Sequence, residues 1–106
     1  MQINANEQLL LAAAKGDTAA VMGWLEQGAD INTTDSFGRT PILSATHHNE
    51  VETVQALIAA GADLNLRDHG ADVNLPDRDD VSPLQNARVR GFDEIAEILV
   101  VAGAIR

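Results

Sequence analysis

The fold is decided by the stretch Thr40-Pro41-Ile42-Leu43-Ser44-Ala45, which predicts where a helix begins and which side of it is apolar. Threonine is a good N-cap, because its hydroxyl accepts a hydrogen bond from a free backbone N–H, and proline suits the first helical position. Asn49 follows at the other end, where asparagine tolerates the left-handed conformation that ends a helix. The stretch and Asn49 together predict one short helix with an apolar side.

A second helix is predicted over residues 51–60. Val54, Leu57 and Ile58 are spaced as i, i+3 and i+4, which places them in one stripe along a helix. Gly61 stops this helix, since glycine adopts the left-handed conformation without strain. The middle of the chain is therefore predicted to form two antiparallel helices, each apolar on one side.

The chain repeats this helix pair. The segment Gly28-Ala29-Asp30-Ile31-Asn32 recurs 33 residues later as Gly61-Ala62-Asp63-Leu64-Asn65, and its first two residues recur 42 residues further on as Gly103-Ala104. In the first copy the two helices are predicted over residues 9–14 and 21–25. One helix pair cannot bury its apolar sides alone, so neighbouring pairs must stack into a continuous core. The predicted fold class is an all-α repeat solenoid.

A 33-residue repeat with two helices, a Thr-Pro-Ile-Leu opening and a Gly-Ala-Asp-hydrophobic-Asn ending resembles the ankyrin repeat, in its small bacterial type. Residues 35–45 follow the family's opening closely, whereas the first copy has Glu7-Gln8 in place of Thr-Pro. The resemblance implies three stacked helix-turn-helix units joined by hairpin-like loops, in a single ankyrin-repeat domain over residues 1–106. The three units are predicted at residues 6–34, 35–67 and 77–106.

The third unit follows the second at an unusual spacing. Residues 60–68 read Ala-Gly-Ala-Asp-Leu-Asn-Leu-Arg-Asp and residues 69–77 read His-Gly-Ala-Asp-Val-Asn-Leu-Pro-Asp, so the block is duplicated at a shift of nine. We expect the inserted segment, about residues 69–77, to form an extended loop between units two and three, because lengthening a surface loop costs little free energy. Natural duplication, loss of one helix pair from a four-unit parent, and engineering all give this spacing.

Composition and charge exclude several classes of function. The chain has 106 residues, no cysteine and a formal net charge of −9, from 16 acidic and 7 basic residues. Without cysteine there is no disulfide, no thiolate metal site and no cysteine nucleophile. An acidic chain repels phosphate groups, so neither nucleic acids nor anionic membranes are expected partners. No segment has the ~20 apolar residues of a membrane span. We expect a cytoplasmic location, or a periplasmic one if a signal peptide has been removed.

Catalytic and metal sites are not expected. His47 and His48 are adjacent, so on a helix they point about 100° apart and do not converge on one metal. Ser44 lies near them in sequence, but a nucleophile and its base must be in hydrogen-bond contact, which spacing alone does not establish. Asp77-Arg78-Asp79 resembles the start of a calcium loop, but Arg88 stands where that loop needs a bidentate glutamate. We predict no catalytic residue, no cofactor and no metal.

The resemblance implies that a partner protein binds the concave face, which is formed by the loop tips and the exposed side of the first helices. By alignment of the motifs, the predicted contact residues are Ala14, Lys15, Ser36, Phe37, Arg39, His47, His48, Arg78, Asp79, Val81, Val89 and Arg90. Phe37 is expected at the tip of a hairpin with little core to join, and aromatic residues are frequent binding anchors. The alternative for Phe37 is packing on the neighbouring hairpin.

We therefore expect a non-catalytic protein–protein interaction module whose partner is another protein. The alternative is a structural or assembly role, through self-association of the end repeats or the extended loop, or as a fragment of a longer array. A homodimer formed by loop exchange or by end-repeat contact belongs to that alternative. Val101 and Ile105 motivate it, because a stack with an open end exposes an apolar surface.

Overall fold

The helices form where the sequence places their caps and apolar stripes. The computed structural model describes residues 4–66 and 81–104. Three predictions lie outside the described residues: the inserted segment at 69–77 with its extended loop, the contact residues Arg78 and Asp79, and the apolar Ile105. Within the described residues the chain forms the helices α1 (Ala5–Lys15), α2 (Thr18–Glu26), α3 (Pro41–His47), α4 (Val51–Ala59), α5 (Pro83–Arg90) and α6 (Asp93–Val101). None of these six helices is long and apolar enough to span a membrane.

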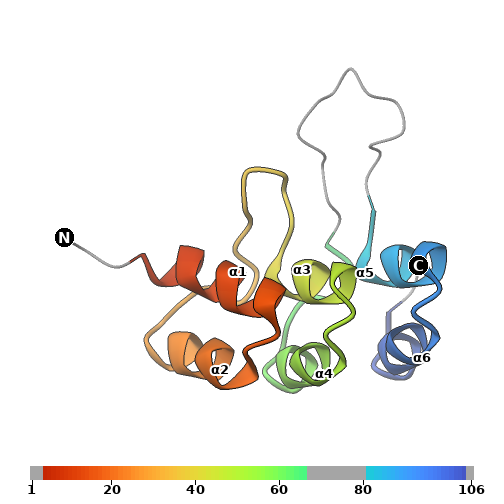
Figure 1. The fold of residues 1–106 in the computed structure, drawn as a ribbon. Helices are drawn as coiled ribbons and strands as arrows, with labels where there is room; N and C mark the ends of the chain where they lie inside the picture. Colours follow the sequence, from red (N-terminus) through yellow and green to blue (C-terminus); the bar gives the residue numbers. More distant parts are fainter. Residues whose placement is uncertain (1–3, 67–80, 105–106) are drawn as a thin grey trace.

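The helices lie in two layers (Figure 1). Helices α1, α3 and α5 lie side by side in one layer, and α2, α4 and α6 lie in the other. Each helix packs both on its partner within the pair and on the equivalent helix of the next pair. The prediction of an all-α solenoid built from stacked helix pairs is therefore confirmed. We propose residues 6–34, 35–67 and 77–106 as the boundaries of the three units.

The caps of the middle pair are those that the sequence predicts. Thr40 is the N-cap of α3, and its hydroxyl accepts a hydrogen bond from the backbone N–H three residues on, at 3.3 Å. Pro41 occupies the first position of the helix, and Asn49 has a φ of 57° just after its end. Helix α4 ends one residue before the predicted residue 60. Ser82 caps α5 with the same geometry as Thr40, because the third pair repeats the Ser/Thr-Pro opening.

The helices of the first pair are longer than predicted. Helix α1 extends beyond the predicted residues 9–14 at both ends, and α2 extends beyond residues 21–25. The side chain of Asn4 accepts a hydrogen bond from the backbone N–H three residues on, at 3.2 Å, and Asp17 caps α2 in the same way at 3.1 Å. Compared with α3 at the 33-residue shift, α1 has an additional turn, residues 5–7. The prediction was too short because it followed the apolar residues and overlooked these polar caps.

The core lies between the two layers and uses the same positions in each pair. Leu9, Ile42 and Leu84 are equivalent residues, and each is at most 1% exposed. Leu57 and Leu99 are completely buried on the second helices, and Trp24, which aligns with them, packs against this core. The other buried members of the cluster are Ala12, Ala13, Val21, Ala45, Val54, Ala62, Ala87 and Ile95. Burial of these aliphatic side chains is the main stabilising contribution to the stack.

Asparagine side chains accept hydrogen bonds from the backbone that follows the second helix of a pair. The Asn32 side chain accepts a hydrogen bond from the backbone N–H of Asp63 at 2.9 Å. The equivalent backbone N–H, that of Asp30, donates to the side chain of Asn6 at 2.8 Å. Asn6 lies on the additional turn of α1, so that turn supplies the hydrogen-bond acceptor for the first pair, as Asn32 supplies it for the second.

The segment between α2 and α3 projects from the helices as a hairpin loop, residues 33–40 (Figure 1). The backbone N–H of Asp35 donates to the carbonyl of Arg39 at 3.0 Å, and the N–H of Gly38 donates to the carbonyl of Asp35 at 3.0 Å. Gly38 has a φ of 81°, which is why a glycine suits this turn. We call the surface formed by the hairpin loop and by α1, α3 and α5 the inner face. It is the face that the resemblance implies for a partner.

Gly16 ends α1 with a φ of 74°, and this gives a first prediction. We expect Gly16→Ala to lower the free energy of unfolding by roughly 1–2 kcal/mol, because a Cβ atom disfavours the left-handed conformation. That Cβ would also meet the carboxylate of Glu50, but this is the end of a flexible side chain that can move away. The measurement is urea unfolding followed by circular dichroism.

Two other glycines are matched controls for Gly16→Ala. Gly28 has a φ of 93° and open space around it, so Gly28→Ala should cost a similar amount. Gly23 lies inside α2 without a positive φ, also in open space, so Gly23→Ala should leave stability unchanged or increase it by up to about 1 kcal/mol. A Gly16→Ala variant as stable as Gly23→Ala would contradict the prediction.

Candidate functional site

The hairpin loop is held in one shape by the side chain of Asp35. Its Oδ1 atom accepts hydrogen bonds from the backbone N–H groups of Phe37, at 2.8 Å, and Arg39, at 3.0 Å. These bonds fix the backbone from which two of the predicted contact residues extend. Asp35 itself was not predicted as a site residue, although an Asp that begins a glycine-containing turn is a known sequence signal for such a loop.

Phe37 lies on the surface of the hairpin loop, as predicted. Its side chain is 42% exposed, and the guanidinium carbon of Arg39 lies 5.3 Å from the centre of its ring. This is a cation–π arrangement, in which the face of the ring attracts the positive charge. The neighbouring hairpin lies outside the described residues, so the alternative that Phe37 packs on it stays a prediction.

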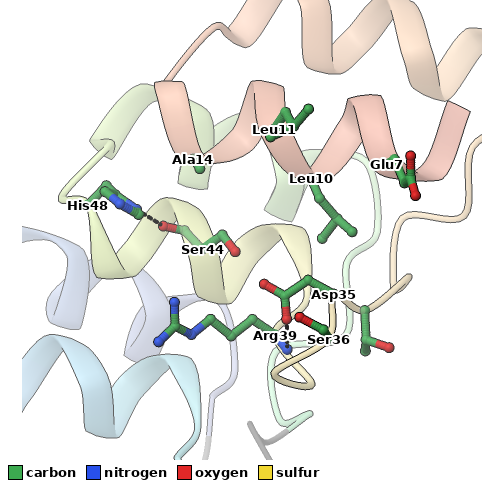
Figure 2. A pocket seen from close by; sticks show the side chains of 10 residues that line it. Glu7, Leu10, Leu11, Ala14, Asp35, Ser36, Arg39, Ser44 and His48 are labelled. Carbon is green, nitrogen blue, oxygen red and sulfur yellow. Dashed lines mark hydrogen bonds between the residues drawn. The ribbon is translucent and has the colours of Figure 1, made fainter. Parts of the chain in front are cut away.

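A groove lies between α1, the hairpin loop and α3 (Figure 2). Its volume is about 470 Å³, and its lining residues are Glu7, Leu10, Leu11, Ala14, Thr34, Asp35, Ser36, Arg39, Ser44 and His48. Figure 2 shows Leu10 pointing from α1 toward Asp35, with Glu7 at one end of the groove and His48 at the other. The groove therefore combines an apolar wall from α1 with polar groups contributed by the loop and α3.

The groove brings together some of the predicted contact residues and adds others that the prediction missed. Ala14, Ser36, Arg39 and His48 all line it. The residues that the prediction missed are Glu7, Leu10, Leu11, Thr34, Asp35 and Ser44. One sequence signal for them was available. Three consecutive leucines, residues 9–11, cannot all face the core, because adjacent residues on a helix point about 100° apart.

His47 and Arg90 lie between the second and third helix pairs and contact each other. Nη2 of Arg90 lies 3.0 Å from Nε2 of His47, and because a guanidinium can only donate, Nε2 accepts this hydrogen bond. The guanidinium of Arg90 also lies 5.9 Å from the ring centre of Phe92. These two predicted contact residues therefore contribute to the junction between the two pairs as well as to the inner face.

The side chain of His48 contacts the backbone carbonyl of Ser44. Nδ1 of His48 lies 2.9 Å from the carbonyl oxygen of Ser44, and an imidazole donates its N–H to such an oxygen. The serine residue is only 6% exposed. The contact thus does not join the hydroxyl to the imidazole, and it forms no nucleophile–base pair.

Three further predicted contact residues lie among the described residues. Lys15 is exposed at the end of α1, Val81 is half-buried just before α5, and Val89 is 86% exposed on α5. Arg78 and Asp79 lie outside the described residues. Among residues 4–66 and 81–104, no group of three His, Asp or Glu side chains is placed to hold a metal ion.

Comparison with known proteins gives several relatives. The chain is 50% identical over 60 residues to the ankyrin repeat protein YahD of Escherichia coli strain K12, covering 57% of this chain and 30% of that protein. It is 35% identical over 97 residues to the B-cell lymphoma 3 protein homolog of Mus musculus, covering 91% of this chain and 20% of that protein. It is 42% identical over 60 residues to the ankyrin repeat and SAM domain-containing protein 6 of Rattus norvegicus, covering 56% of this chain and 7% of that protein. The chain thus spans less than a third of the length of each of these relatives.

A family model for three copies of the ankyrin repeat matches residues 9–105. This match covers nearly the whole chain and agrees with the three stacked helix pairs. Ankyrin repeats generally mediate protein–protein interaction, and the family is generally non-enzymatic. The helix caps, the 33-residue period and this match together show that the chain belongs to the ankyrin repeat family.

Proposed function

We propose that this chain is a non-catalytic module that binds a partner protein on its inner face. The observation that carries the proposal is the groove, because it opens on the inner face and is lined by residues from two neighbouring repeats and the loop between them. A rigid surface assembled from several repeats suits protein recognition, since little conformational entropy is lost when it binds.

The side chains around the groove supply the kinds of contact that protein partners use. Phe37 and Arg39 are of the residue types most frequent among binding anchors, and they lie together on the hairpin loop. Leu11 adds apolar surface, with 54% of its side chain exposed. Aromatic, cationic and apolar groups on one face are typical of the centre of an interface.

Photo-crosslinking in cells of the source organism tests this proposal. A photoreactive amino acid replaces Ser36, which lines the groove, or Gln55, which is exposed on α4 in the opposite layer. We expect a crosslink to another protein from position 36 and none from position 55. Crosslinks from position 55 alone, or from neither position, would contradict the proposal.

Self-association through the end repeats is the second candidate. It is supported by Val100 and Val101 on α6, which are 47% and 82% exposed. On α5 the surface is more polar: Gln85 and Arg88 stand where α3 has the buried Leu43 and Thr46. The same crosslinking experiment separates the candidates, because self-association would give a crosslink between two copies of this chain.

A further inference from the structure

We infer that the groove between α1 and the hairpin loop binds a peptide segment of the partner in which an aliphatic side chain lies next to a lysine or arginine. This inference rests on the proposed function and adds the chemistry of the partner. It follows from three features of the groove: a partly exposed apolar wall, two carboxylates of which one lies at its end, and an interior of limited size.

The apolar wall is formed by Leu10, Leu11 and Ala14 on α1. Leu11 is 54% exposed, and the equivalent residues of the second and third repeats are Ser44 and Asn86. Because two repeats have a polar residue at this position, stacking does not need a leucine there. Together with the adjacent Leu10, this leucine forms an exposed apolar patch, which favours a role in binding apolar groups.

Leu10 shows that this part of the groove is incompletely filled. Its equivalent in the second repeat, Leu43, is only 1% exposed, so the fold is able to cover this position completely. Leu10 is only half-buried and lines the groove. An aliphatic side chain of a partner would bury the remaining surface of Leu10 together with Leu11, which is favourable by the hydrophobic effect.

Two carboxylates, those of Glu7 and Asp35, line the groove beside this wall. Glu7 is exposed on the additional turn of α1 at one end of the groove, and Asp35 lies on the hairpin loop across from Leu10 (Figure 2). Neither carboxylate forms an ion pair with another residue among those that the structure describes. A lysine or arginine placed beside them would gain an opposite charge, in a chain whose net charge of −9 already attracts basic segments.

The other end of the groove has the opposite character. His48 lies there, and the side chain of Arg39 extends in the same direction, away from Glu7 (Figure 2). The groove therefore has a direction, and the basic residue of the partner is expected at the Glu7 end. A volume of about 470 Å³ lies in the range of pockets for small ligands, so it holds a few side chains and not a whole folded partner.

Selection from a phage-displayed library of random peptides tests this inference. The targets are the wild-type chain, Glu7→Lys in the groove, and Glu97→Lys, which makes the same charge reversal at an exposed position of α6. We expect the wild type and Glu97→Lys to select peptides with an aliphatic residue beside a lysine or arginine. Glu7→Lys should lose the preference for basic residues.

Affinities of one selected peptide, made synthetically, complete the test. Glu7→Lys and Leu11→Asp should each weaken its binding by about tenfold or more, Glu7→Gln should weaken it less, and Glu97→Lys should leave it unchanged. Both groove residues are exposed, so melting curves should show that the variants remain folded. Peptides without the basic and aliphatic pair, failure to select any peptide, or equal effects of Glu7→Lys and Glu97→Lys would overturn the inference. A crosslink from position 36 to another protein would still be expected in that case, so failure of this inference is distinguishable from failure of the proposed function.

Discussion

Replacing Leu57 with alanine is expected to lower the free energy of unfolding by roughly 2–5 kcal/mol. Leu57 is completely buried on α4, which belongs to the middle pair and packs on α2, α3 and α6. Removal of most of its side chain leaves a cavity that the surrounding helices fill only in part. Small domains are stabilised by only about 5–15 kcal/mol, so a loss of this size removes a large share of the total.

Two probes in urea measure this effect. Circular dichroism reports all six described helices, and fluorescence reports Trp24, the only tryptophan, which lies on α2 in the first repeat. Because neighbouring repeats stabilise each other, both probes should show the same shift in midpoint although the substitution lies in the second repeat. Leu11→Ala is the matched control: its leucine is 54% exposed, so its effect should stay within about 0.5 kcal/mol. A Leu57→Ala variant that shifts only the dichroism signal would contradict coupling between the repeats.

The second large effect concerns binding. We expect the double substitution Phe37→Ala and Arg39→Ala to weaken binding of the partner crosslinked at position 36 by about 2 kcal/mol or more, which is roughly 30-fold in Kd. The two side chains lie together on the hairpin loop, with the guanidinium over the ring. Removing both takes away an aromatic surface and a positive charge from the same part of the inner face.

The single substitutions show whether the two side chains act together. If the Arg39 guanidinium binds the partner while it lies over Phe37, the double variant should lose less affinity than the sum of the two single variants. Asp35 holds the loop through backbone groups that both substitutions leave in place, so stability should remain near that of the wild type. Titration calorimetry gives the affinities. An affinity equal to that of the wild type would remove the hairpin loop from the binding site.

Most of the fold was predictable because its signals are local. Thr40, Pro41 and Asn49 fix both ends of α3 through bonds and backbone angles that involve only neighbouring residues. The buried stripe of α4 follows from a spacing along one helix. The same reasoning underestimated α1, because Asn4 and Asn6 are polar and give no hydrophobic signal, although one caps the helix and the other binds Asp30.

The groove was less predictable, because it depends on how segments from two repeats are placed. Alignment of the repeat motifs identified Ala14, Ser36, Arg39 and His48. It did not identify Glu7, whose position at one end of the groove results from the additional turn of α1. Nor did it show that His47 and Arg90 contact each other, since no pattern within one repeat describes a contact between two.

Because of the hydrogen bond from the backbone N–H of Asp63 to the side chain of Asn32, copies of the middle repeat can follow one another. One 33-residue period, residues 33–65, contains both the backbone donor at its Asp63 and, in Asn65, an asparagine equivalent to Asn32. A copy of that period inserted after itself would bring its own donor and its own acceptor. The inner face could thus grow by whole repeats without a change to any existing junction, whereas α1, which contains its own Asn6, is suited to begin such an array.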